Sequence, residues 1–224
     1  MKRTPLSERV LPDYTRGEEI MNTVTHIAGG VFAAAALVLC VVTAALHGNT
    51  WGVVSGAVYG VSMLALYTMS SLYHGLPPQS FAKRVLQVID HCTIFVLIAG
   101  TYTPVTLCGV RPYDEPAAWA LFGTVWGLAA LGILLNAIDL RMFRVVSMIL
   151  YLGMGWCIVL AAPTVLRETP AGAVWLLVLG GVAYTVGAVL YIIGKKRRYA
   201  HSVFHVFVVI GSVLQFLCIL LYWM

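Results

Sequence analysis

Apolar residues dominate the chain in seven long stretches, and short polar connections separate them. Each stretch is roughly 20 to 24 residues long, which is enough for one helix to cross the hydrocarbon core of a bilayer. The predicted spans are Val24–Leu46, Trp51–Tyr73, Val85–Leu107, Pro116–Ile138, Val145–Leu166, Ala171–Gly194 and Ser202–Met224. Because a helix satisfies its own backbone hydrogen bonds in lipid, the pattern predicts an all-α, polytopic membrane protein with a seven-transmembrane helix bundle.

The composition agrees with this pattern and excludes a soluble domain. Hydrophobic residues make up 60% of the chain and charged residues only 10%, whereas soluble domains carry about 25% charged residues. No polar stretch is long enough to fold separately, so we expect one membrane domain over residues 1–224, with residues 1–17 as a polar N-terminal segment. The five cysteines lie singly in apolar stretches and form no C-x-x-C pair, which favours free thiols over disulfides.

The positive charges predict the orientation. Of the 14 Lys and Arg residues, 12 lie in the N-terminal segment and in alternate connections, and two lie in the connections between. The positive-inside rule then places the N-terminus in the cytoplasm and the C-terminus outside. The net charge of +5 is thereby explained by topology, and we expect no nucleic-acid partner. Pro104 and Pro163 are expected to kink or end helices within their spans.

Polar side chains gather near the predicted cytoplasmic ends of several spans. His201 and His205 are four residues apart at the start of the last span, so both imidazoles share one helix face. His74 ends the second span, with Ser70 one turn deeper, and Asp90 lies about two turns into the third span. Such a pair of histidines forms either a metal site or an interfacial polar patch, and residues at matching depth on other spans favour the metal.

A further group of polar residues lies just before and within the start of the first span. Glu18, Asn22 and His26 follow one another at intervals of four and so lie on one helix face. The set fits either an amphipathic entry to the membrane or groups that support the metal and face its substrate. We predict the supporting, substrate-facing role because His26 lies too deep for an ordinary interfacial position.

Three imidazoles and one acid suit zinc. A catalytic zinc site uses three protein ligands and keeps a fourth position for water, and we predict His74, His201 and His205 as these ligands. Asp90 is predicted to be a general base that holds the water, or else a fourth ligand, while Ser70 orients the water or polarises a carbonyl. We choose Asp90 over the adjacent His91 because a backbone carbonyl satisfies a histidine readily, and neighbouring helix positions point about 100° apart.

Together these residues make the chain resemble the bacterial hemolysin III family, which is related to the progestin and adipoQ receptors. The resemblance covers nearly the whole chain and rests on four motifs. They are Glu18 through His26, Ser70-x-x-x-His74, Asp90 through Phe95 running into Ala99 through Pro104, and His201-x-x-x-His205. The resemblance implies seven helices, a cytoplasmic N-terminus in a bacterial cytoplasmic membrane, and zinc held by the three histidines. It also implies that Asp90 holds the zinc-bound water and that Ser70 is the family serine.

The resemblance leaves three functions open. The wider superfamily contains ceramidase-like hydrolases, which implies a zinc-dependent hydrolase acting on the amide or ester of a membrane lipid that enters from the inner leaflet. The family name implies a pore-forming cytolysin, although a pore needs polar lining through the whole membrane and the outer parts of the spans are apolar. In the third reading the protein is a membrane sensor in which zinc only ties helices together.

Overall fold

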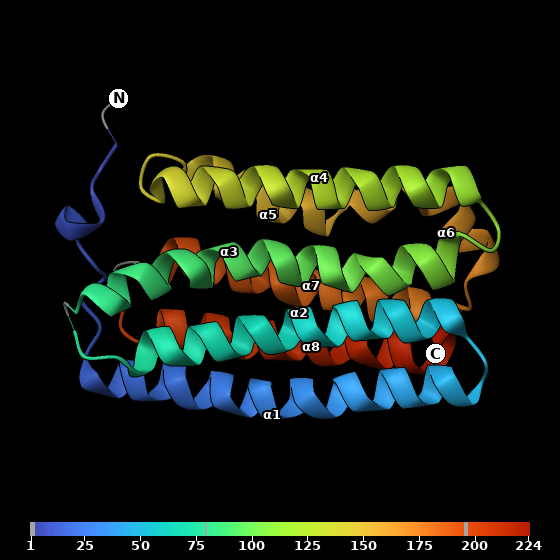
Figure 1. The fold of residues 1–224 in the computed structure, drawn as a ribbon, viewed down its shortest axis with the longest axis horizontal. Helices are drawn as coiled ribbons and strands as arrows, with labels where there is room; N and C mark the ends of the chain where they lie inside the picture. Colours follow the sequence, from blue (N-terminus) through green and yellow to red (C-terminus); the bar gives the residue numbers. More distant parts are fainter. Residues whose placement is uncertain (1–2, 79, 195–196) are drawn as a thin grey trace.

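Long helices run side by side in an antiparallel bundle in the computed structural model, which describes residues 3–78, 80–194 and 197–224 (Figure 1). The helices are α1 (Arg16–Leu46), α2 (Thr50–Gly75), α3 (Phe81–Pro104), α4 (Glu115–Asp139), α5 (Arg144–Gly155), α6 (Ala162–Glu168), α7 (Ala171–Ile193) and α8 (Ala200–Trp223). Within these described ranges there is no strand, and seven helical segments are long and apolar enough to span a membrane. The predicted fold class and number of spans are therefore confirmed.

Side chains just before several helices define where these begin. Thr15 and Glu18 form a reciprocal capping box at the start of α1, and Asn49, Ser80 and Asp114 each accept a hydrogen bond from a backbone amide in the first turn of α2, α3 and α4. The helix α1 consequently starts well before the predicted span, because its polar first turns belong to the helix although they lack the apolar signal.

Both prolines interrupt their spans, as expected. The helix α3 ends at Pro104 and continues as a π-helix over Val105–Val110. In the fifth span, α5 is followed by a 3-10 helix over Cys157–Ala161 and then by α6, which has Pro163 in its first turn. Pro104 has no amide hydrogen to donate to the carbonyl of the preceding turn, so the α-helical hydrogen bonding of α3 stops there. Pro163 instead lies in the first turn of α6, where the missing amide hydrogen costs no helical hydrogen bond.

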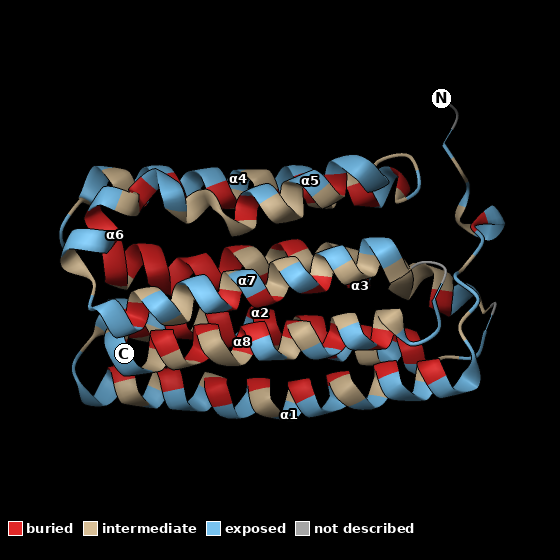
Figure 2. Ribbon diagram, turned by 180° about the vertical axis from the view of Figure 1, so that it is seen from behind, coloured by how far each residue is buried: buried red, intermediate tan, exposed pale blue. Residues whose placement is uncertain are grey.

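Apolar side chains form two clusters inside the bundle. One lies between α1, α2 and α8 around Tyr59, Tyr67 and Ile219, and the other joins α3, α4 and α5 around Phe95 and Met154. Gly29 allows α1 to approach α2 closely, since a Cβ there would lie 2.6 Å from the ring of Tyr67. Exposed residues follow the outward faces of the helices in Figure 2, and many of them are large and apolar. The five cysteines are free, as predicted.

One end of the bundle, which we call the histidine end, holds the starts of α1, α3, α5 and α8 and the ends of α2, α4 and α7 (Figure 1). The N-terminal segment crosses this end, and the C-terminus lies at the opposite end. The basic connections counted above meet at the histidine end, although Lys2, Lys195 and Lys196 lie outside the described residues. That this end faces the cytoplasm stays a prediction from the charge pattern.

Candidate metal centre

Three histidines from two helices meet at the histidine end. His74 lies in the last turn of α2, and His201 and His205 lie on one face of the first turns of α8. Their ligand atoms all lie within 4.8 Å of one another. The Nε2 atom of His201 is 3.3 Å from Nε2 of His74 and 3.0 Å from Nε2 of His205. The structure thus brings together the three residues that the sequence predicts as metal ligands.

The other ring nitrogens show which atoms are free to bind a cation. Nδ1 of His74 lies 2.6 Å from the Glu19 carboxylate, and Nδ1 of His205 lies 3.3 Å from the carbonyl oxygen of Asn22. Both acceptors require the proton on Nδ1, so these two rings present bare Nε2 atoms to His201. Nitrogens that bind one tetrahedral zinc lie about 3.3 Å apart, because Zn–N bonds are about 2.0–2.1 Å long. The donor set therefore fits zinc.

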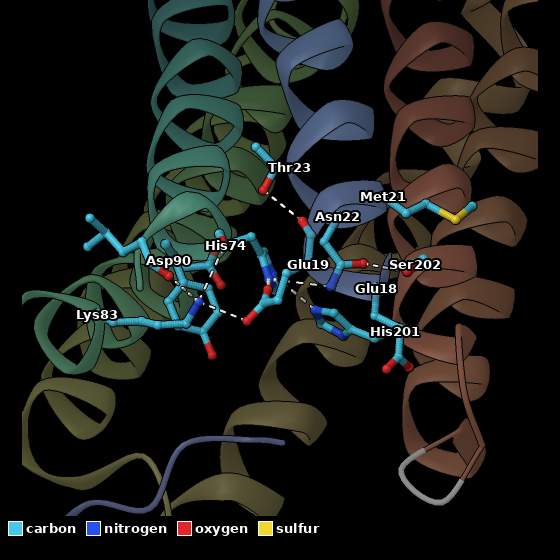
Figure 3. Close-up of polar contacts among 12 residues, drawn as sticks. Glu18, Glu19, Met21, Asn22, Thr23, His74, Lys83, Asp90, His201 and Ser202 are labelled. Carbon is cyan, nitrogen blue, oxygen red and sulfur yellow. Dashed lines mark hydrogen bonds and ion pairs between the residues drawn. The ribbon is translucent and has the colours of Figure 1, made fainter. Parts of the chain in front are cut away.

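Asn22 of α1 connects both helices that carry the histidines. Its Oδ1 accepts a 2.6 Å hydrogen bond from the hydroxyl of Ser202, its backbone carbonyl accepts from His205, and its Nδ2 lies 3.3 Å from Nδ1 of His74. The side chain is fully buried. Asn22 was predicted to support the metal or face the substrate, and the structure places it against His74 and His205. Figure 3 shows its contacts with His74 and Ser202.

The two neighbouring glutamates of α1 have different partners. The Glu18 carboxylate accepts hydrogen bonds from Thr15 and, at 2.8 Å, from the backbone amide of Tyr199 just before α8. Tyr199 has a positive φ of 60°, an unfavourable conformation for a residue with a side chain, and the bond to Glu18 holds it. Glu18 therefore positions the start of α8, whereas Glu19 contacts a histidine directly.

Sequence reasoning assigned no role to Glu19, because it followed the face defined by intervals of four residues. Intervals of three also fall on one face of a helix. Glu19 lies three residues before Asn22, and this spacing is the signal that could have identified it.

His26 lies beside the three histidines. Its ring stacks on that of His205 at 3.7 Å between centroids and 9° between planes, and it meets Tyr67 edge-on at 5.1 Å. Among the described residues, neither ring nitrogen of His26 has a hydrogen-bond partner. His26 thus packs against one face of His205, and it does not join the group of ligand atoms.

Asp90 lies in α3, and Ser70 lies in α2. Asp90 is largely buried, and its carboxylate lies 3.6 Å from Nδ1 of His91. Within the described part of the chain, the group of ligand atoms contains the three histidines and not Asp90. Nδ1 of His91 donates to the backbone carbonyl oxygen of Gln87 at 2.9 Å, the kind of partner that led us to prefer Asp90. Ser70 is buried one turn before His74; the catalytic roles of Asp90 and Ser70 stay predictions.

The N-terminal segment lies against two of the three histidines through Tyr14. The ring of Tyr14 stacks on His201 at 5.0 Å and 20° and lies 5.7 Å from the ring of His74. Nearer the start of the segment, the backbone amide of Thr4 donates to the carboxylate of Asp139 at the end of α4. Burial raises the pKa of Tyr14, so its phenol remains neutral.

Comparisons with known proteins show which proteins the chain resembles. A family model described as "Haemolysin-III related" matches residues 14–216. The chain is 39% identical over 209 residues to "Hemolysin-3 homolog" of Bacillus subtilis (strain 168), covering 93% of this chain and 96% of the relative. It is 37% identical over 205 residues to "Hemolysin-3" of Bacillus cereus, covering 92% and 91%. It is also 25% identical over 225 residues to human "Monocyte to macrophage differentiation factor", covering 97% and 88%.

Proposed function

The chain belongs to the haemolysin-III-related family, and from this premise we propose that it is a zinc-dependent hydrolase that cleaves an amide or ester bond of a membrane lipid. One observation carries the proposal: three imidazole nitrogens from α2 and α8 meet as a set of three ligands. A structural zinc site usually has four protein ligands, whereas a catalytic site has three and leaves one position for water or substrate.

The roles of the residues follow from their positions. His74, His201 and His205 would hold the ion through their Nε2 atoms. Zinc bound there supplies Lewis acidity toward a carbonyl oxygen and toward water. Asp90 accepts the proton of the attacking water on a carboxylate oxygen, as a general base, and Ser70 orients the water or the substrate carbonyl through its hydroxyl. Two contacts keep the imidazole of His205 in place: its Nδ1 donates to the backbone carbonyl of Asn22, and its ring stacks on the ring of His26.

The surroundings of the centre favour a lipid as substrate. On α1, the polar residues Glu19 and Asn22 alternate with Ile20, Met21 and Val24, whose side chains are 54%, 37% and 57% exposed. Apolar side chains exposed at this level of a membrane helix contact acyl chains. A lipid that enters sideways from the leaflet at the histidine end would reach the centre within one or two helical turns. The charge pattern supports the inner leaflet as this leaflet, and we propose a bacterial cytoplasmic membrane as its location.

Two other functions have specific support. The relatives named "Hemolysin-3" favour a pore-forming cytolysin, and the partial cover by Tyr14 favours a sensor in which zinc only joins α2 to α8. Electrical recording of the purified protein in a planar bilayer tests the first alternative, because a hydrolase gives no discrete conductance steps. Metal that resists exchange, in a protein that cleaves no lipid, would support the second.

The decisive experiment uses the whole chain in lipid nanodiscs. Bound metal is measured by elemental analysis, and ceramide-like amides and glycerolipid esters are then followed by mass spectrometry. We expect about one zinc per chain and release of a fatty acid from one of these lipid classes. Product formation that is equal in wild type and in Asp90→Asn would contradict the mechanism, and a protein without stoichiometric metal would contradict the proposal as a whole.

A further inference from the structure

A buried lysine lies next to the histidine end. Lys83, in the first turn of α3, has only 2% of its side chain exposed. Its ammonium group lies 2.8 Å from Oε1 of Glu19 (Figure 3). A buried ammonium is costly unless an anion and further hydrogen bonds compensate it. Glu19 is that anion.

The two carboxylate oxygens of Glu19 have separate partners. Oε1 receives the ammonium of Lys83, and Oε2 lies 2.6 Å from Nδ1 of His74. Glu19 therefore joins the ammonium of Lys83 to the imidazole of His74 through one carboxylate, and charge-assisted hydrogen bonds of this kind are stronger than neutral ones. The chain of contacts runs from α3 through α1 to α2, so three helices determine how one imidazole is oriented.

Lys83 also holds the backbone of the same histidine. Its ammonium donates to the carbonyl oxygens of His74 at 3.3 Å and Leu76 at 3.0 Å. These carbonyls lie at the C-terminus of α2, where helical hydrogen bonding ends and basic groups are favourable. The backbone amide of Lys83 is in turn bound by the hydroxyl of Ser80. His74 is therefore restrained at its backbone by Lys83 and at its ring by Glu19.

We propose that Lys83 and Glu19 form a positioning pair that keeps the Nδ1 proton on His74 and aims its Nε2 atom at the other two histidines, so that the pair sets the affinity of the centre for a divalent metal. The inference rests on the metal centre of the proposed function and adds the residues that tune it. Carboxylates that orient metal-binding histidines typically contribute about 10- to 100-fold to metal affinity.

The test measures metal affinity by competition with a coloured chelator, using the full chain in nanodiscs. Glu19→Gln should weaken zinc binding by about 10- to 100-fold, and Lys83→Met should weaken it in the same direction. Adding Lys83→Met to Glu19→Gln should cost little more, because the two residues act as a unit. Lys83→Arg, which keeps the charge and the donors, should restore most of the affinity. Arg84→Gln is the matched control, since it removes a neighbouring charge that contacts Ser7 instead.

A second readout separates positioning from mere folding. Cobalt-loaded protein should show ligand-field bands that shift in Glu19→Gln and stay unchanged in Arg84→Gln. Wild-type affinity in Glu19→Gln, or tighter binding in Lys83→Met, would overturn the inference while the metal centre stands. Absence of metal in the wild type would instead overturn the proposed function. If Lys83→Met yields no folded protein, the comparison of Glu19→Gln with Arg84→Gln decides the question.

Discussion

His47, which follows α1, and His74, in the last turn of α2, lie at opposite ends of the bundle. His47 is exposed, and its Nδ1 meets the carbonyl of Met224 at 3.1 Å. His74 is 2% exposed, and its two ring nitrogens face a carboxylate on one side and two imidazoles on the other. The same residue type thus fastens a chain terminus at one end and joins a candidate metal centre at the other. The difference lies in how many helices bring polar groups to the same point.

The polar groups at the opposite end cap helices and bond to the ends of neighbouring helices. Asn49 caps α2 and donates to the carbonyl of Trp223, and Asp114 caps α4 and accepts from Thr164. Each of these contacts joins groups at or near the ends of helices. At the histidine end, by contrast, Asn22 lies against two imidazoles, one from α2 and one from α8. Among the described residues, three imidazoles that could hold a metal ion meet at that end.

Substitution of a histidine should give the largest difference in metal binding between the two ends. His205→Ala should abolish stoichiometric metal binding, an effect larger than the roughly 10- to 100-fold expected for an outer partner, because it removes one of three ligands. His47→Ala should bind metal as the wild type does. Elemental analysis of both purified variants provides the measurement. Equal metal content in the two would mean that the centre lies elsewhere.

Removal of the acid should have the next largest effect. Asp90→Asn should lower lipid hydrolysis by about 100- to 10,000-fold, the usual contribution of a general base, while bound metal remains. Asp114→Asn at the opposite end keeps its capping ability and should hydrolyse normally. The measurement is the initial rate of hydrolysis by each variant, with the lipid that the screen identifies as substrate. Loss of metal in Asp90→Asn would instead make Asp90 a ligand.

Asn22 and Asn49 permit a comparison of stability. Asn22→Ala leaves the buried hydroxyl of Ser202 without its acceptor, which should lower the free energy of unfolding by about 1–3 kcal/mol. Asn49→Ala should cost about 1 kcal/mol, as for other helix caps. Thermal unfolding followed by circular dichroism in detergent should rank the melting temperatures as wild type, Asn49→Ala, Asn22→Ala. The reverse order of the two variants would show that Asn22 adds little to the packing of α1 on α8.

Tyr14 should have the smallest effect. Its stacking on His201 is worth about 0.5–1.5 kcal/mol, as for other aromatic pairs. Tyr14→Ala should therefore speed the release of metal to a chelator by up to about tenfold, whereas Tyr222→Ala near the opposite end should leave the rate unchanged. Stopped-flow absorbance with a chromogenic chelator measures both. An unchanged rate in Tyr14→Ala would mean that the N-terminal segment does not cover the centre.

The sequence by itself determined the spans, their alternation and the residues of the candidate centre. Seven apolar stretches predict seven crossings, because length and hydropathy are local properties that lipid selects directly. The interval of four between His201 and His205 predicts one shared face, and the alternation of spans brings His74 to the same end. The two prolines that interrupt α3 and the fifth span were also evident from the sequence.

Only the tertiary structure decided which neighbours hold these residues. Intervals of four residues led to Glu18 and passed over Glu19, and packing assigned Glu18 to Tyr199 and Glu19 to His74. The burial of Lys83 and the stacking of Tyr14 on His201 were likewise absent from the pattern. A periodic pattern shows which face of a helix is polar, whereas the partner of each side chain depends on how helices from distant parts of the chain pack against one another.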